Sequence, residues 1–560
     1  MPEIVNPLTG LTSCFFEPAL DYVVVKAPRW QFENFPGASR RLGPEMKSIG
    51  ESMGIAEDFS TAFAKAWAMT QGSQLSYPAN WPMNRLREEL AQPSDQRMRA
   101  LFAAFQQGLK LEEIQALTGI SSWFLCQFEA MSHQFYPTFK WPHFCSWGLR
   151  QIDSLAGEFP ACSPYLYLSP FAEFHFGAGP WVLVLGSGPY GIGSSVEFDF
   201  CCVSGVQALQ AAGYRVAMLN ANPETLSSDY DLADALIFEP LLPESINAVV
   251  AALRPVGILA SLGGQVPQNL LAVLPQHWPF WGTPLGQIRR AENRLSFALA
   301  LDQLSLPQPP WSRADNLASA LAFGEKVGYP LIFRSACVLG GSGMAVIADP
   351  EALKSHFESR LIDLNGALLN RFLPEAREFE IDGIARSGQL EYYLFSENVE
   401  NAGIHSGDSH HLFPALQLSE TERSQALDLA TRLVHAFEIS GLFNLQFLSL
   451  EGQVLVLEAN LRASRNLPFL SHVCGQNLIA LAITRLLSPT PLLSAPIEIS
   501  AQQVGIRAPS FSWHSMVGHE PVLGVVMKAT GEFCALAESQ QLAWDGIYSH
   551  SGRSHTAVLE

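Results

Sequence analysis

A segment near the beginning of the chain is repeated at its end, and this repeat constrains the fold more than any other sequence feature. Lys26-Ala-Pro28 matches Arg507-Ala-Pro509 at an offset of 481 residues. The same offset, without a gap, relates Gly37, Leu42-Gly43, Met46-Lys47, Gly50-Glu51 and Ala56-Glu57 to Gly518, Leu523-Gly524, Met527-Lys528, Gly531-Glu532 and Ala537-Glu538. So many identities in one register indicate a tandem duplication. We therefore expect the tail of a first copy (the first tail), then a complete second copy that ends in a second tail.

Length and composition indicate a large protein with several domains. The chain has 560 residues, of which 48% are hydrophobic, enough for separate cores. Its net charge is -19 and it contains no Lys/Arg-rich run, which argues against nucleic acid as a partner. Nine cysteines without a C-x-x-C pair, no signal-like N-terminus and no run of 18 apolar residues predict a cytoplasmic protein that does not enter a membrane.

The order of the expected elements predicts a multidomain protein of the α/β and α+β classes. We expect the first tail, a helical segment with a linker that is irregular from about residue 135, a parallel α/β domain, an α+β domain (the body) and the second tail. The expected bounds are 1–75, 76–180, 181–286, 287–490 and 491–560.

The α/β domain opens with a glycine-rich loop after its first strand. Gly186-Ser-Gly188-Pro-Tyr-Gly191 fits the dinucleotide fingerprint G-x-G-x-x-G. The next strand, however, ends in Asn220-Ala-Asn222 and not in the acidic residue that would bind a ribose. The loop therefore favours a tight strand-to-helix turn over an NAD-dependent oxidoreductase.

Two apolar strands late in the body carry three oxygen donors. Glu458 and Asn460 are two residues apart, so they share one face of their strand, and the preceding strand can place Gln446 opposite them. Carboxylate and amide oxygens together with substrate phosphates suit Mg²⁺, and the following Arg462 and Arg465 suit capture of a phosphate or carboxylate. The pattern predicts a site for ATP and Mg²⁺; the alternative is an edge hairpin with solvated charges.

Four further signals in the body are typical of phosphate handling. Arg294 is expected in a helix, Arg334 at the end of a strand, Gly340-Gly341 in a loop and Glu378 after a strand. A glycine-rich loop can turn its backbone N–H groups toward a triphosphate while arginines supply the charge. The order of these signals ahead of Gln446 favours nucleotide binding over surface charges and an ordinary hairpin turn.

Several longer motifs support a family resemblance. They are Gly186–Asp199, Asn222-Pro-Glu-Thr225, Gly263-Gly-Gln265, Glu400–Asp408 and Glu458-Ala-Asn-Leu-Arg-Ala-Ser-Arg465. With them the chain resembles the carbamoyl phosphate synthetase large chain, specifically its second, ATP-grasp half. The forms Gly186-Ser-Gly188 and Asn460-Leu-Arg462 are similar to the fused animal-type enzymes. The resemblance runs from about Leu11 to Ser539.

The resemblance implies roles for individual residues. ATP would be contacted by Arg294, Arg334, Gly340, Gly341, Arg371, Leu373, Glu378, Ile404, His405, Ser406, Gln446 and Glu458. Mg²⁺ or Mn²⁺ would be bound by Gln446, Glu458 and Asn460. Arg462 and Arg465, with Asn460, would be catalytic and would hold carbamate and the transferred phosphoryl group.

The resemblance also implies a reaction, in which carbamate and ATP give carbamoyl phosphate and ADP for pyrimidine or arginine synthesis. A glutaminase, a complete first half and a regulatory domain are not among the 560 residues. We therefore expect separate first-half and glutaminase chains that start from bicarbonate and ammonia, or a self-paired homo-oligomer. The domain before the body would be the pre-ATP-grasp domain, and the helical segment would be similar to an oligomerisation domain.

Two departures from the family pattern leave other functions open. Ser335-Ala-Cys337 stands where the family has Pro-Ser-Tyr, and Gly191 replaces a frequent arginine. One alternative is an ATP-grasp ligase redirected to another carboxylate or carbamate acceptor. The other is a non-catalytic ATP-binding scaffold, which the retained metal ligands and arginines argue against, because buried charge is costly to keep.

Overall fold

The computed structural model describes residues 4–7, 10, 13, 15, 19–70, 81–134, 147–153, 163–334, 344–359 and 367–550. Its helices are α1 (Phe59–Thr70), α2 (Met83–Ala91), α3 (Arg97–Gln106), α4 (Leu111–Thr118), α5 (Ser122–Gln134), α6 (Val196–Ala211), α7 (Pro243–Leu253), α8 (Gln265–Leu270), α9 (Leu285–Glu292), α10 (Arg294–Gln303), α11 (Leu317–Val327), α12 (Pro350–Glu358), α13 (Glu420–Ala436), α14 (Leu467–Cys474), α15 (Leu478–Leu487) and α16 (Gln540–His550). Its strands are β1 (Val23–Arg29), β2 (Gly50–Ala56), β3 (Gly148–Gln151), β4 (Tyr165–Ser169), β5 (Trp181–Leu185), β6 (Arg215–Asn220), β7 (Ala235–Phe238), β8 (Gly257–Leu259), β9 (Trp311–Arg313), β10 (Leu331–Arg334), β11 (Met344–Ile347), β12 (Leu368–Arg371), β13 (Arg377–Arg386), β14 (Gln389–Asn401), β15 (His411–Phe413), β16 (Gly441–Leu450), β17 (Gln453–Asn460), β18 (Ile497–Glu498), β19 (Val504–Ser510) and β20 (Gly531–Ala537).

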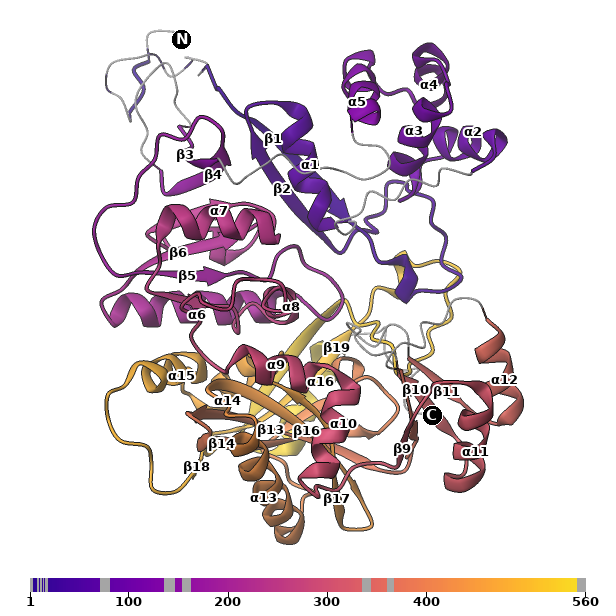
Figure 1. Ribbon diagram of the computed structural model, residues 1–560, viewed down its shortest axis with the longest axis vertical. Coiled ribbons are helices and arrows are strands. Elements are labelled where there is room, and N and C mark those ends of the chain that lie inside the picture. Colours follow the sequence, from indigo (N-terminus) through magenta and orange to yellow (C-terminus); the bar gives the residue numbers. More distant parts are fainter. Residues whose placement is uncertain are drawn as a thin grey trace.

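The first tail and the helical segment form the upper part of the molecule in Figure 1. In the first tail, β1 and β2 form an antiparallel hairpin that packs against α1. The helices α2 to α5 enclose an aromatic core in which Phe63 and Trp67 of α1 meet Phe102 and Phe128. Burial of large aromatic rings therefore joins the first tail to the helical segment.

The α/β domain lies below the first tail and contains a six-stranded sheet of order β3-β4-β7-β6-β5-β8. Every residue of its strand Trp181–Leu185 is buried, as expected for a parallel strand covered on both faces. The sequence predicts an irregular linker in this segment, and that prediction is wrong for β3 and β4. These two strands pair antiparallel with each other, and β4 extends the parallel sheet through β7. Short edge strands in a segment rich in proline and aromatic residues carry little periodic signal.

The body forms the lower part of the molecule and has two sheets. The smaller has the order β11-β10-β12-β9, and the larger follows β17-β16-β13-β14-β15-β19-β20. Helix α13 packs on the larger sheet and begins with a capping box, in which Ser419 and Glu422 exchange hydrogen bonds with each other's backbone. One hydrophobic core runs from the α/β sheet into this sheet, so the two domains share their packing.

The second tail completes the larger sheet of the body. Its β19 pairs antiparallel with β15 and with β20, which places β20 at the edge of the sheet. The loop between β19 and β20 packs against the equivalent loop of the first tail, where the backbone N–H of Ser39 donates to the carbonyl of Val517 at 2.8 Å. The two copies of the repeat therefore touch each other.

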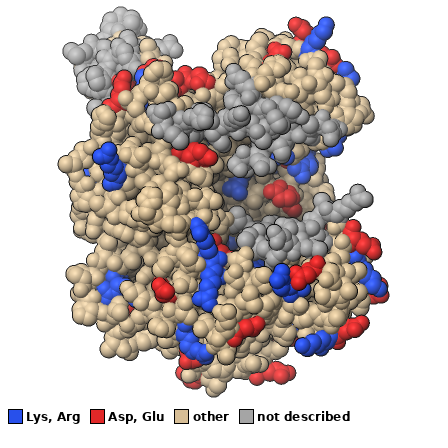
Figure 2. Space-filling model, viewed as in Figure 1, with Lys and Arg blue, Asp and Glu red and all other residues tan. Residues whose placement is uncertain are grey.

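Charged groups are spread over the face of the molecule in Figure 2 without a large area of one sign. Among the residues that the structure describes, no single helix is long and apolar enough to cross a membrane. The pair α14 and α15 meets this test only when joined across a bend of 97°.

Candidate functional site

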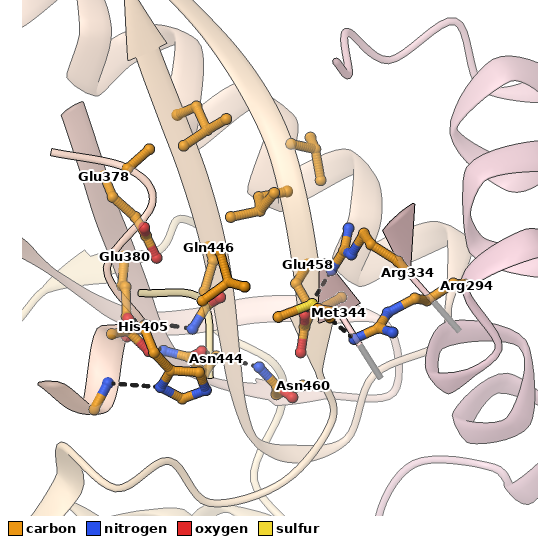
Figure 3. Close-up of a pocket in the computed structure, with 18 of the residues that line it drawn as sticks. Arg294, Arg334, Met344, Glu378, Glu380, His405, Asn444, Gln446, Glu458 and Asn460 are labelled. Carbon is orange, nitrogen blue, oxygen red and sulfur yellow. Dashed lines mark hydrogen bonds and ion pairs between the residues drawn. The ribbon is translucent and has the colours of Figure 1, made fainter. Parts of the chain in front are cut away.

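A cavity of about 790 Å³ opens where the body meets the α/β domain and the second tail. Its lining includes Gly193 and Gln265 from the α/β domain, Glu458 from the body, and Val525 and Met527 from the second tail. Figure 3 shows the polar side chains of the body that face this space. The site is therefore built by parts of the chain that are far apart in sequence.

One face of the larger sheet supplies most of the polar lining. Gln446 lies opposite Glu458, and Asn444 opposite Asn460, across β16 and β17. On the other side of β16, Gln446 lies opposite Glu380. The expected convergence of Gln446, Glu458 and Asn460 is confirmed by this register, and it follows from the two-residue period of a strand.

Glu458 is surrounded by positive charge. Its Oε2 lies 3.1 Å from Nη2 of Arg334, and Arg294 approaches from the start of α10 (Figure 3). Desolvation in the site favours the protonated carboxyl, but Arg334, Arg294 and Arg462 outweigh it and lower the pKa of Glu458. The carboxylate is therefore ionised and available to a cation at neutral pH.

Two carboxyl groups of β13 lie on the same face. Burial, with the neighbouring Glu380 and Glu458 adding to it, raises the pKa of Glu378 to about 8. Glu380 is also buried, and it accepts hydrogen bonds from Asn444 at 2.7 Å and Asn466 at 2.9 Å. Glu378 is therefore protonated at neutral pH until a positive charge enters the cavity.

His405 lies in a turn at the edge of the cavity. Burial lowers the pKa of His405 to about 4, with Arg465 adding to the shift. Its Nδ1 accepts from the backbone N–H of Gly407 at 3.1 Å, so the neutral ring carries its proton on Nε2. The backbone N–H of His405 donates to the carbonyl of Gly524 in the second tail at 2.8 Å. His405 is thus an uncharged donor that the second tail helps to fix.

The two arginines after β17 have different surroundings. Nη2 of Arg465 pairs with Glu197 at 3.0 Å and with Glu532 at 3.3 Å. Arg462 instead donates from Nε to Oε1 of Gln265 at 3.0 Å. Arg465 therefore links three parts of the chain, while Arg462 is held by neutral acceptors and keeps its charge for the cavity.

The remaining candidates divide into those at the cavity and those outside the described residues. Arg371, Leu373, Ile404 and Ser406 line the cavity with the residues above. Gly340 and Gly341 lie outside the described residues, as do Ser335 and Cys337. Sequence reasoning assigned no role to several lining residues: Gln265, Glu292, Met344, Glu380, Asn444, Asn466, Arg507, Val525 and Met527. Strand periodicity could have found Asn444 and Glu380, because they lie two residues from the candidates Gln446 and Glu378 on the same strands.

Three family models match the chain. They are the carbamoyl phosphate synthase preATP-grasp domain at residues 179–290, the carbamoyl-phosphate synthase L chain ATP binding domain at 293–488, and the large-chain oligomerisation domain at 51–135. The mitochondrial carbamoyl-phosphate synthase [ammonia] of the frog Aquarana catesbeiana is 37% identical over 96% of this chain. The chain belongs to the carbamoyl phosphate synthetase large-chain family.

Other relatives agree with this assignment. The human carbamoyl-phosphate synthase [ammonia] is 36% identical over 97% of this chain, and the multifunctional protein URA2 of Saccharomyces cerevisiae is 34% identical over the same share. The chain spans about 40% of the length of the frog and human proteins and 27% of the yeast protein.

Solved structures share the fold of about two thirds of this chain. An ADP complex of the N5-carboxyaminoimidazole ribonucleotide synthetase purK has a TM-score of 0.51 at 15% identity, over 66% of this chain and 96% of its own. The biotin carboxylase domain of the Hydrogenobacter thermophilus 2-oxoglutarate carboxylase also scores 0.51, at 14% identity, over 67% of this chain and 90% of its own. The expected α/β and α+β architecture with an ATP-grasp domain is confirmed.

The donor set of the cavity fits a hard cation held together with a nucleotide. No group of three His, Cys, Asp or Glu side chains within the described part of the chain could hold a metal by itself. Gln446 donates its amide N–H to Glu380 at 3.3 Å, which leaves its oxygen for the cavity beside the ionised Glu458. These oxygens would need phosphate oxygens to complete an octahedral shell, as Mg²⁺ sites for nucleotides usually do.

Proposed function

We propose that the chain phosphorylates carbamate with ATP to give carbamoyl phosphate and ADP. The observation that carries this proposal is the placement of Arg462 and Asn460 in the same cavity as Glu458, Gln446 and Arg334. One group of residues suits an anionic acceptor and the other suits a nucleotide with its cation. Such an arrangement can bring the acceptor and the γ-phosphoryl group together.

In the proposed reaction, an oxygen of carbamate forms a bond to the γ-phosphorus of ATP. The bond from that phosphorus to the β,γ-bridging oxygen breaks, and ADP leaves. Phosphoryl transfer depends mainly on position and charge neutralisation, which the arginines supply. Arg334 and Arg294 would neutralise the phosphates, and Arg462 would hold the carbamate. Mg²⁺ or Mn²⁺, held by Gln446, Glu458 and Asn460 with phosphate oxygens, would neutralise the charge that develops on the transferred group.

The protonation states support these roles. His405 is neutral and can donate from Nε2 to a phosphate oxygen or to the acceptor without adding charge. Glu378 is protonated at neutral pH and would lose its proton when the nucleotide brings its cation. Binding of the metal–nucleotide complex would therefore release a proton.

Relatives and neighbours support the choice of substrates. The frog protein is named as a carbamoyl-phosphate synthase, and the biotin carboxylase domain was solved with MgADP and bicarbonate. We propose that carbamate reaches this site from a first-half chain that uses bicarbonate and ammonia from a glutaminase chain, or from a second copy of the chain. The setting would be cytoplasmic pyrimidine or arginine synthesis.

The decisive experiment is the reverse reaction, because it needs no source of carbamate. Purified chain is given carbamoyl phosphate and MgADP, and ATP is measured with luciferase. We expect ATP from the wild type and a rate from Glu458→Ala that is lower by about 100- to 1,000-fold, since one positioned electrostatic group is worth about this much in such sites. Glu358→Ala removes an exposed carboxylate at the end of α12 and should match the wild type.

The outcomes separate the alternatives. No ATP from a folded wild type that binds MgADP would refute carbamate phosphorylation and favour another acceptor. If the chain does not bind MgADP, it has no ATP site, and only a scaffold role remains. ATP at equal rates from the wild type and from Glu458→Ala would mean that this cavity is not the site.

A further inference from the structure

Arg462 is held by the α/β domain, and this contact has a direct effect on how the arginine can bind an anion. Its Nε donates to Oε1 of Gln265 at 3.0 Å. Its Nη1 donates to the carbonyl of Ala463 at 2.9 Å, and its Nη2 donates to Oδ1 of Asn460 at 3.2 Å. Each of the three guanidinium nitrogens therefore has one acceptor inside the protein.

The N–H groups of Arg462 that have no acceptor among the described residues determine which edge of its guanidinium can bind an anion. Arg462 has five N–H groups, one on Nε and two on each Nη. Three are used by Gln265, Ala463 and Asn460, so one N–H on each Nη remains. Binding an anion side-on would need Nε, which Gln265 occupies. A phosphate or carboxylate that binds in a bidentate manner must use the pair of Nη atoms.

Gln265 is itself fixed by its neighbours. Its Nε2 donates to Glu292 at 2.9 Å and to Asn269 at 2.7 Å. Because Arg462 can only donate, the amide must present its oxygen to the arginine and its nitrogen to the carboxylate. Both the position and the orientation of the acceptor are therefore determined.

The loop before Gln265 requires glycine at two positions. A Cβ on Gly263 would lie 2.6 Å from the carbonyl carbon of Gly186, and Gly264 has a φ of 77°. Nearby, the backbone N–H of Ala463 donates to the carbonyl of Ser261 at 2.9 Å. The segment after β17, which carries Arg462, and the loop that leads into α8, which begins at Gln265, are thus joined directly, and this gives the Gly263-Gly-Gln265 motif a physical role.

We propose that Gln265 is a positioning residue that directs the Nη edge of Arg462 toward the anionic acceptor. This inference rests on the proposed function for the identity of the acceptor, which is carbamate or the carbamoyl phosphate formed from it. Gln265 does not touch the reacting atoms; it acts through Arg462. The α/β domain thereby influences acceptor binding through Arg462.

The main test is Gln265→Met, which keeps the length of the side chain and removes the acceptor. With Nε freed, the guanidinium is held only through its two Nη atoms, so its orientation is less firmly fixed. We expect the KM for carbamoyl phosphate in the reverse reaction to rise about tenfold, the effect of one hydrogen bond to a charged group. The KM for MgADP should stay within twofold. Gln210→Met, in α6 of the same domain and outside the cavity, is the matched control.

A second variant separates orientation from charge. Gln265→Glu keeps an oxygen for Nε but places a carboxylate against Glu292, with Arg462 and Glu458 as the other charged groups nearby. A proton shared by the two carboxylates restores the donor–acceptor pair. The defect of Gln265→Glu should therefore shrink as the pH falls from 8 to 6, whereas that of Gln265→Met should not. A merely structural role of Gln265 predicts no such difference.

Binding of inorganic phosphate, measured by calorimetry with MgADP present, keeps this inference separate from the proposed reaction. We expect the Kd for phosphate to rise in Gln265→Met by the same factor as the KM. If the wild type is active and Gln265→Met has the same KM for carbamoyl phosphate and the same Kd for phosphate, the positioning role is overturned. If the wild type makes no ATP but Gln265→Met binds phosphate more weakly than the wild type does, the proposed reaction is refuted and the positioning role is retained. Loss of MgADP binding in both variants would make Gln265 structural and overturn the proposal.

Discussion

The two tails have the same local structure and different surroundings. The first tail contains β1, β2 and α1, and the second contains β19, β20 and α16. The first and last residues of β19 and β20 are numbered 481 higher than those of β1 and β2. Their registers also agree, because Val23 pairs with Ala56 as Val504 pairs with Ala537. A repeated sequence has therefore produced a repeated hairpin and helix.

The surroundings of equivalent residues differ sharply. Met527 is 1% exposed in the wall of the cavity, whereas its equivalent Met46 is 78% exposed. The side chain of Arg507 is 3% exposed beside β15, and that of Lys26 is 49% exposed. Local sequence thus determines the hairpin, while the body determines which of its residues are buried. Pairs of equivalent substitutions can test this distinction.

The largest effect is expected where the first tail joins the α/β domain. Lys65 of α1 and Glu239 form a fully buried pair, and Lys65 also donates to the carbonyls of Ile55 and Leu168. Lys65→Ala leaves Glu239 without its counter-charge and should lower the free energy of unfolding by about 3–5 kcal/mol. Urea denaturation measures this loss.

The double substitution Lys65→Met with Glu239→Leu is the control for that prediction. It removes both charges and keeps most of the volume, so much of the loss should be recovered. A double variant as unstable as Lys65→Ala would contradict the account.

The second prediction compares the two methionines. Met527→Ala leaves a cavity beside Arg465 and Gly407 and should cost about 2–5 kcal/mol, with a lower rate of ATP formation. Met46→Ala removes an exposed side chain and should change the free energy of unfolding by no more than about 0.5 kcal/mol. Equal effects in thermal unfolding would mean that the two tails are packed alike.

The third prediction concerns pH and the attachment of the second tail. Asp408 accepts the backbone N–H groups of Lys528 and Ala529, yet burial raises its pKa to about 6 from a usual value near 3.8. The folded state therefore binds this proton more tightly than the unfolded state. Its contribution to the free energy of unfolding should be complete below pH 4 and fall by up to about 3 kcal/mol as the pH rises to 6.

Asp408→Asn tests this sign. The variant cannot ionise, so its free energy of unfolding should depend less on pH between 4 and 6 than that of the wild type. A wild type that becomes more stable over this range relative to the variant would contradict the prediction.

The smallest effect is expected where the two tails touch. Gly37 and Gly518 have φ values of 85° and 93°, and a Cβ on either would lie within 3 Å of the other's carbonyl oxygen. Gly37→Ala and Gly518→Ala should each cost about 1–2 kcal/mol. The double variant should cost less than their sum, because one shift of the contact relieves both clashes. Strict additivity in denaturation curves would argue against a shared contact.

The sequence predicted those parts of the site that depend on strand geometry. Gln446, Glu458 and Asn460 converge because alternate residues of a strand share a face, and the repeat predicted both tails. Strands β3 and β4 were missed, since their apolar runs are short and lie among prolines and aromatic residues. The contact of Gln265 with Arg462 could not be foreseen either, because it depends on how two domains pack.

The position of Met527 in the cavity wall has a consequence for the synthesis of the protein. The strands that carry Gln446 and Glu458 leave the ribosome well before the strand pair that follows residue 500. Domains fold in the order in which they emerge. The nascent body therefore has an unfinished cavity, and the wall that contains Met527 is added only after the last hairpin has been made and has docked.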